Sequence, residues 1–156
     1  MCFLKTKESK LLKAKRDIKV YKIGRYADTN LFKSLYKNFT YHVNLIELED
    51  VNFSEFYVEQ GLHSFINLSI RYINVTKELT YKFVDIATTT NYEYVRYADD
   101  LFVSPLFIGE FIIPQNSNYM LNDKGEVVSN SIIYTGRHIP IVPNTDLKIK
   151  ELWKEK

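Results

Sequence analysis

The sequence predicts a single α+β domain, covering residues 1–156, built on a mostly antiparallel sheet with an N-terminal and a central helix. Its length is that of one ordinary domain, and its 46% apolar and 26% charged residues are a globular composition. Only 5 glycines and 4 prolines interrupt it, which indicates a compact chain without long linkers. Segments with strand-like apolar patterns outnumber those with helical spacing, and this balance favours α+β.

The N-terminal part predicts a helix followed by a strand. Residues 8–16 form the expected helix, with Leu11, Leu12 and Ala14 facing inward. Residues 18–26 are rich in β-branched side chains, and they predict a buried strand.

The next two segments predict further extended structure. Residues 39–48 alternate well enough to form a second strand, and one face of it carries the apolar side chains Phe39, Tyr41, Val43 and Leu45. Residues 56–65 are expected to be a strand or a loop that turns at Gly61.

The central helix is expected over residues 68–82, where apolar residues recur with helical spacing. Ser64 or Asn67 would cap its N-terminus by accepting a hydrogen bond from a free backbone N–H group.

The C-terminal half has the clearest pattern. Residues 106–114 predict a strong strand that Pro114 ends. The cluster Asn122–Gly125 is a turn-forming sequence between two strand-like runs, and it predicts a hairpin. Residues 146–156 are expected to form a closing helix.

Charge and cysteine content limit the partners and the compartment. The net charge of +2 argues against a nucleic-acid partner, and the N-terminal lysines are expected to be a solvated face. One cysteine, Cys2, rules out an intramolecular disulfide. We expect neither a signal peptide nor a membrane span, which favours the cytoplasm.

The segment 96–103, RYADDLFV, resembles the catalytic Tyr-x-Asp-Asp hairpin of reverse transcriptases, where paired aspartates hold Mg²⁺. A polymerase palm also needs a distant third aspartate and a much longer chain. We therefore interpret Asp99 and Asp100 as an acidic turn between strands.

The histidines and the cysteine do not predict a metal centre. His42, His63 and His138 are far apart and lack the spacing of metal ligands. Cys2 has no histidine near it in sequence, so a nucleophilic role is not expected. We expect no bound metal.

Three segments of the chain, 13–24, 61–65 and 111–133, resemble a family of short, uncharacterised proteins from gut bacteria and their phages. The resemblance covers most of the chain. It implies a gene carried by a phage or mobile element, and it assigns no chemistry.

The same segments are faintly similar to the ADP-ribosyltransferase superfamily. That resemblance implies a cation at Lys22 or Arg25 holding the NAD pyrophosphate, and Ser64 orienting the nicotinamide ribose. The catalytic carboxylate would stabilise the developing oxocarbenium charge, but serines stand where the family pattern needs it. Glu126 lies several residues early, on the expected hairpin turn.

Two functional hypotheses follow. The first is a non-enzymatic accessory or protein-interaction domain without a cofactor, in which tyrosines supply the contact area for another protein. The alternative is an ADP-ribosyltransferase-like enzyme, active or degenerate, that binds NAD. The alternative needs Lys22 or Arg25, Ser64 and a carboxylate to converge on one concave surface.

Overall fold

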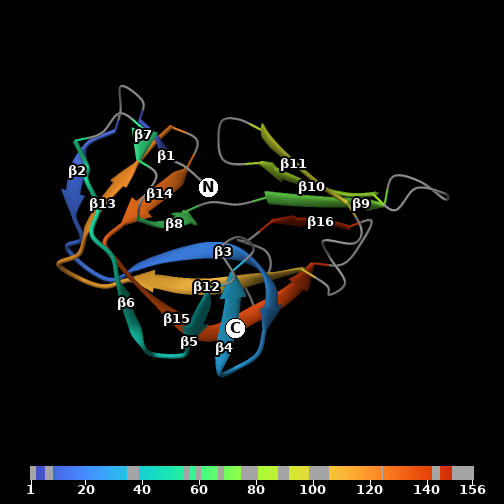
Figure 1. The fold of residues 1–156 in the computed structure, drawn as a ribbon, viewed down its shortest axis with the longest axis horizontal. Coiled ribbons are helices and arrows are strands. Elements are labelled where there is room, and N and C mark those ends of the chain that lie inside the picture. The colour runs from blue at the N-terminus through green and yellow to red at the C-terminus, as the bar shows by residue number, and fades with distance from the viewer. Residues whose placement is uncertain are drawn as a thin grey trace.

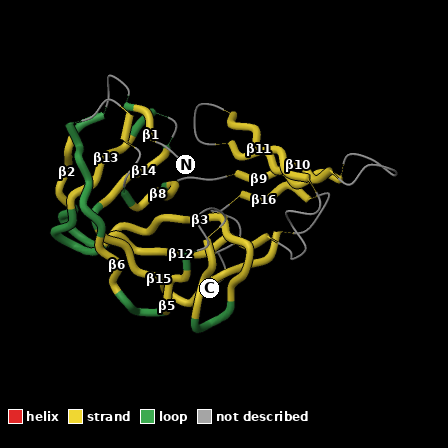
Figure 2. Tube along the Cα trace, viewed as in Figure 1, coloured by secondary structure: helices red, strands yellow, loops and turns green. Residues whose placement is uncertain are grey.

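The fold is seen in a computed structural model (Figure 1). It describes residues 3–5, 9–34, 39–54, 57–58, 61–66, 69–74, 81–87, 92–98, 106–123, 125–141 and 145–148. These residues form strands, turns and bends, and none of them is helical (Figure 2). The described part is therefore mostly β, and the predicted α+β class is wrong.

A ten-stranded antiparallel sheet, the main sheet, contains most of the described strands. Its order is β2 (Leu11–Lys13), β13 (Asn118–Leu121), β14 (Glu126–Ser129), β8 (Leu62–Phe65), β3 (Ile18–Ala27), β12 (Leu106–Ile113), β15 (Ser131–Ile141) and β6 (Ile46–Leu48). From β3 branch β4 (Leu31–Ser34) and, beyond it, β5 (Thr40–His42). β2 and β6 are thus the two ends of the path.

Two smaller sheets complete the described structure. One pairs β1 (Phe3–Leu4) with β7 (Tyr57–Val58). The other has the order β11 (Tyr92–Ala98), β10 (Tyr81–Ala87), β9 (Ser69–Asn74) and β16 (Thr145–Lys148).

The predicted N-terminal helix is replaced by β2. Its three residues pair with β13, with Leu12 opposite Tyr119 and Leu11 opposite Met120. Leu11 and Leu12 are exposed, and only Ala14 is buried as expected. The edge of β13 offers backbone hydrogen-bond partners along its length, and this pairing overrides the helix propensity of a lysine- and leucine-rich segment.

The predicted central and closing helices are also wrong where the structure describes them. Residues 69–74 and 81–82 lie in β9 and β10, which pair with Asn74 opposite Lys82. The isoleucines and tyrosine of β9 suit a strand better than a helix. Residues 146–148 belong to β16, which pairs with β9. The rest of the two predicted helices, residues 68, 75–80 and 149–156, lies outside the described residues.

The predicted strand 39–48 is split into β5 and β6. Asn44 has a positive φ of 62°, which an extended strand cannot contain. Tyr41 is buried, whereas Phe39 and Leu45 are exposed, so the predicted apolar face does not form.

The other strand predictions are confirmed. β3 occupies residues 18–27, and β12 lies between β3 and β15. β13 and β14 form the predicted hairpin, in which Gly125 N–H donates to the Asn122 carbonyl oxygen at 3.2 Å and Gly125 has a φ of 81°. The predicted turn at Gly61 separates β7 from β8.

Strands β3, β4, β5, β15 and β12 form a closed ring of neighbours. β5 is followed by Val43, which makes an isolated bridge to Tyr134 of β15, and the Asn44 N–H donates to the Tyr134 carbonyl oxygen at 2.9 Å. β15 pairs with β12, β12 with β3, and β3 with β4. The lower part of Figure 1 shows these strands curling around one another.

Four aromatic side chains fill the ring. Phe32 has its ring centroid 5.0 Å from that of Phe111 and 5.5 Å from that of Tyr134, and Tyr41 lies 5.1 Å from Phe111. The Phe32–Phe111 and Tyr41–Phe111 contacts are edge-to-face, a geometry that is favourable beyond the apolar area that it buries. All four side chains are buried, and they form the centre of the larger hydrophobic core.

Candidate functional site

Lys22 is a cation on the inner face of β3. Its Nζ donates a hydrogen bond to the His63 carbonyl oxygen and lies 5.4 Å from the centroid of the Tyr41 ring. Burial lowers the pKa of the Lys22 ammonium to about 8, and the carboxylate of Glu49 opposes that shift. The aromatic face and the carbonyl oxygen both stabilise the charged form, so Lys22 is held as a partly desolvated cation.

Ser64 lies beside Lys22. β3 and β8 pair through Tyr21 and Phe65, so the next residues along these antiparallel strands, Lys22 and Ser64, are neighbours on one face. Ser64 is 1% exposed, and its hydroxyl has no hydrogen-bond partner among the described residues.

Glu126 lies on the opposite face. It pairs with Phe65, and because successive side chains of a strand alternate, Glu126 and Ser64 point to different sides of the sheet. Its Oε1 accepts a hydrogen bond from Asn122 Nδ2 at 2.8 Å, and its backbone N–H donates to Asn122 Oδ1 at 3.1 Å. These two hydrogen bonds stabilise the hairpin turn.

Arg25 is exposed and lies where the register of β3 against β4 shifts, between Gly24 and Tyr26. Of the four predicted site residues, the structure brings together Lys22 and Ser64. It holds Glu126 on the other face of the sheet, so no single surface collects the cation, the serine and this carboxylate.

A buried ionic cluster, which the sequence patterns did not predict, surrounds Glu110. This carboxylate is 4% exposed, although it lies in the middle of β12. Its Oε2 is 3.1 Å from Arg137 Nη1 and 3.6 Å from Lys19 Nζ, and Thr135 Oγ1 lies 3.2 Å from Oε1. A lone charge within the apolar run LFIGEFII was the signal that could have revealed it.

Tyr21 lies directly across from Glu110. Burial and the Glu110 carboxylate raise the pKa of the Tyr21 phenol to about 12, and the charge of Arg137 opposes the shift. The negative charge of Glu110 on β12 is thus paired with cations from the two flanking strands, Lys19 on β3 and Arg137 on β15, an arrangement that ties the three strands together.

The histidines, Cys2 and the Asp99–Asp100 pair are the other residues that the sequence offered for chemistry. No group of three or more His, Cys, Asp or Glu side chains among the described residues could hold a metal ion. His138 Nδ1 lies 3.2 Å from the Tyr134 hydroxyl, and His42 is exposed on β5. Cys2, Asp99 and Asp100 lie outside the described residues.

The two end strands of the main sheet expose large aliphatic side chains. At β6, the exposed fractions are 50% for Leu45, 46% for Ile46 and 72% for Leu48. At β2 they are 56% for Leu11 and 37% for Leu12. Each strand pairs on one side only with a described strand, β6 with β15 and β2 with β13.

In the part of the chain that the structure describes, no helix is long and apolar enough to cross a membrane. No family model, curated protein or solved structure matches the chain.

Proposed function

We propose that this chain is a non-enzymatic protein-interaction domain, and that the edge strand β6, with Leu45 before it, is its recognition surface. The observation that carries the proposal is the exposure of three large aliphatic side chains within four residues, Leu45, Ile46 and Leu48, at an edge of the main sheet. Large aliphatic side chains in water are stabilised when a partner covers them.

The backbone of β6 supports the same function. The strand hydrogen-bonds to β15, with Ile46 opposite Ile133 and Leu48 opposite Ser131. An extended segment of another protein can add to such an edge through main-chain hydrogen bonds, while alternate side chains supply specificity. Ile46 and Leu48 alternate in this way.

The alternative, an ADP-ribosyltransferase-like enzyme that binds NAD, has one observation in its favour. Lys22 and Ser64 are neighbours on one face, as a cation and a serine that contact NAD would be. The carboxylate that it requires is the weak point, because Glu126 points to the other face and is engaged by Asn122.

Affinity capture with matched baits tests the proposed function. Immobilised wild-type chain is exposed to a lysate of the organism that encodes it, beside an Ile46→Asn/Leu48→Asn variant and a Tyr26→Asn control. Tyr26 is also exposed, at 43%, but lies on β3. We expect wild type and the control to retain the same partner and the β6 variant to lose it. Equal retention by all three baits would contradict the assignment of β6.

A further inference from the structure

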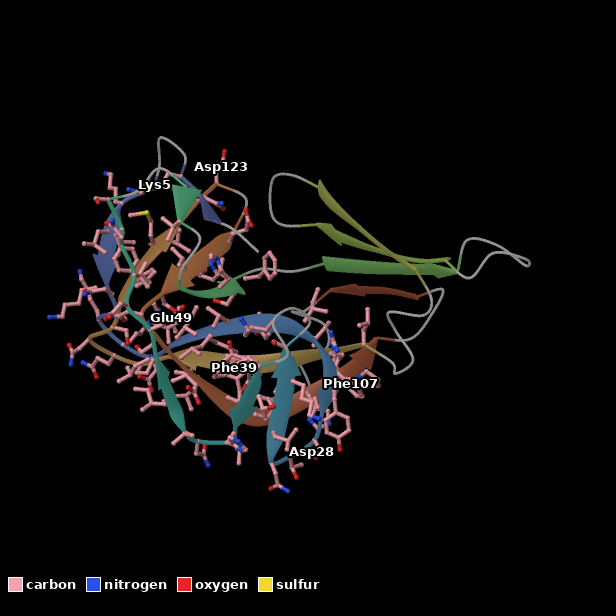
Figure 3. All side chains as sticks on the ribbon, viewed as in Figure 1. Lys5, Asp28, Phe39, Glu49, Phe107 and Asp123 are labelled. Carbon is pink, nitrogen blue, oxygen red and sulfur yellow. The ribbon has the colours of Figure 1, made fainter. Side chains whose placement is uncertain are left out.

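The two ends of the main sheet carry opposite charges. On or beside β2 the exposed cations are Lys10, Lys13, Lys15 and Arg16. On or just after β6 the acidic residues are Glu47, Glu49 and Asp50, of which the first two are half-buried and the last is exposed. Glu49, labelled in Figure 3, follows β6. Among the described residues near β2, Asp17 is acidic, and its carboxylate accepts a hydrogen bond from the Gln115 N–H at 2.9 Å.

The two ends are also alike in strand length and in their exposed aliphatic side chains. Each is a three-residue strand that pairs with one described neighbour, and each exposes aliphatic side chains, as described above. The basic end and the acidic end are therefore complementary in charge and similar in apolar character.

We propose that β6 of one copy docks against β2 of a second copy, so that the main sheet continues from one molecule into the next. This proposal rests on the proposed function, and it names the partner as the chain itself. Contact between different surfaces of identical molecules is heterologous, so it produces a ring if the rotation closes and an open filament if it does not.

Charge selects this arrangement over the symmetric ones. Pairing β6 with β6 would bring Glu47 and Glu49 of one copy close to the same residues of the other. Pairing β2 with β2 would do the same with the lysines. Like charges facing each other across strands are destabilising, whereas opposite charges contribute favourably.

Two blocked variants test the direction of assembly. Leu11→Asn/Leu12→Asn blocks the β2 end and leaves β6 intact, while Ile46→Asn/Leu48→Asn blocks β6 and leaves β2 intact. All four positions are exposed, so circular dichroism and thermal unfolding should match wild type. Sedimentation velocity over low micromolar to millimolar concentrations then measures the assembly.

Wild type is expected to form species larger than a dimer as concentration rises, and to form fewer of them at high salt. Each variant alone should be monomeric. Their equimolar mixture should form a dimer and nothing larger, because one intact β2 end and one intact β6 end remain. Tyr26→Asn should assemble like wild type.

A wild type that stays monomeric throughout would overturn the proposal, as would a blocked variant that still associates with itself, since that indicates symmetric pairing. If wild type is monomeric but affinity capture still retains a partner through Ile46 and Leu48, the proposed function stands and self-association alone is overturned. Assembly that requires Ile46 and Leu48, without any other captured protein that depends on them, would leave the chain itself as the partner of β6.

Discussion

At the scale of single residues, the buried Glu110 carboxylate is held by its neighbours. It contacts two cations and lies beside a threonine hydroxyl while almost wholly removed from water. Burying a charge is costly unless it is paired and hydrogen-bonded. Glu110 can therefore be buried as a carboxylate only because these partners surround it.

Replacing Glu110 tests that reasoning. Glu110→Gln removes the negative charge from a site that holds Arg137 and Lys19, and we expect it to lower the free energy of unfolding by about 1–3 kcal/mol, since both cations retain some solvent. Lys19→Met is the matched control and should cost well under about 1 kcal/mol, because the Lys19 side chain is 50% exposed. Urea unfolding measures both. A Glu110→Gln midpoint equal to that of wild type would show that the ion pairs are not needed.

Because burial lowers the pKa of Lys22, we expect an unusual dependence of stability on pH. Folded Lys22 releases its proton near pH 8, whereas the unfolded chain keeps it to about 10.5, so the unfolded state binds more protons between these values. Stability therefore rises with pH in that window. Tyr21 acts in the opposite direction, because its folded pKa of about 12 exceeds the ordinary 10.0, and stability is lost as pH rises above 10.

The measurement is the urea midpoint from neutral pH to about pH 11. Wild type should rise and then fall. Lys22→Met, which keeps the length of the apolar stem, should lose the rise and keep the fall. An unchanged rise in that variant would assign it to another group.

At the scale of elements, the closed ring can form only because its strands pack closely around the Phe32 side chain. A Cβ atom on Gly109 would lie 2.5 Å from Phe32 Cε2, and one on Gly24 would lie 2.5 Å from Phe32 Cζ. These two glycines make room for a phenylalanine ring between β3, β12 and β4. The absence of side chains there is a packing requirement that no periodic pattern in the sequence reveals.

Gly109→Ala should therefore destabilise the fold by about 1–3 kcal/mol through overpacking against Phe32. Phe32→Leu on its own leaves a smaller side chain and should cost a similar amount. In a double-mutant cycle, Phe32→Leu should cost less in the Gly109→Ala background than in wild type, because the leucine relieves the clash. Additive costs would show that the two positions are not in contact.

The elements that the sequence could predict are those whose structure depends on local residue patterns. The strands β3 and β12 and the hairpin of β13 and β14 were foreseeable because their β-branched runs and turn residues act locally. β2 was not, because a strand formed by pairing with a distant edge overrides local helix propensity. The break at Asn44 depends on one backbone angle, and the sequence pattern ran through it.

Long-range strand pairing also decides which of the candidate site residues lie together. Lys22 and Ser64 were chosen for their residue types, and pairing does bring them together. Whether Glu126 joins them depends on strand register, since a shift of one residue moves a side chain to the other face. Register is set by long-range pairing, so the sequence alone could not exclude Glu126.

At the scale of the whole molecule, the main sheet curls into a closed ring at one place, and its path ends at two edge strands, β2 and β6. The ring buries its aromatic side chains, while the edges at β2 and β6 expose aliphatic ones. The proposed recognition surface is one of these two edges.

This organisation predicts the absence of NAD turnover. With Glu126 on the face opposite Ser64, the charge developing on a nicotinamide ribose beside Lys22 would have no carboxylate from that residue to stabilise it. Losing one such electrostatic element costs about 10²–10³ in rate. Nicotinamide release measured by chromatography should equal the protein-free blank. Release above the blank that Glu126→Gln abolishes would establish the enzymatic alternative.

Site-specific photo-crosslinking at the β6 edge tests directly whether β6 is the recognition surface. A photoreactive amino acid replaces Leu48, whose side chain is 72% exposed, and in a second sample replaces Tyr26. After irradiation in cells that encode the chain, we predict a covalent adduct from position 48, with another protein or a second copy, and none from position 26. Equal adducts from both positions, or none from position 48, would contradict the claim that β6 is the recognition surface.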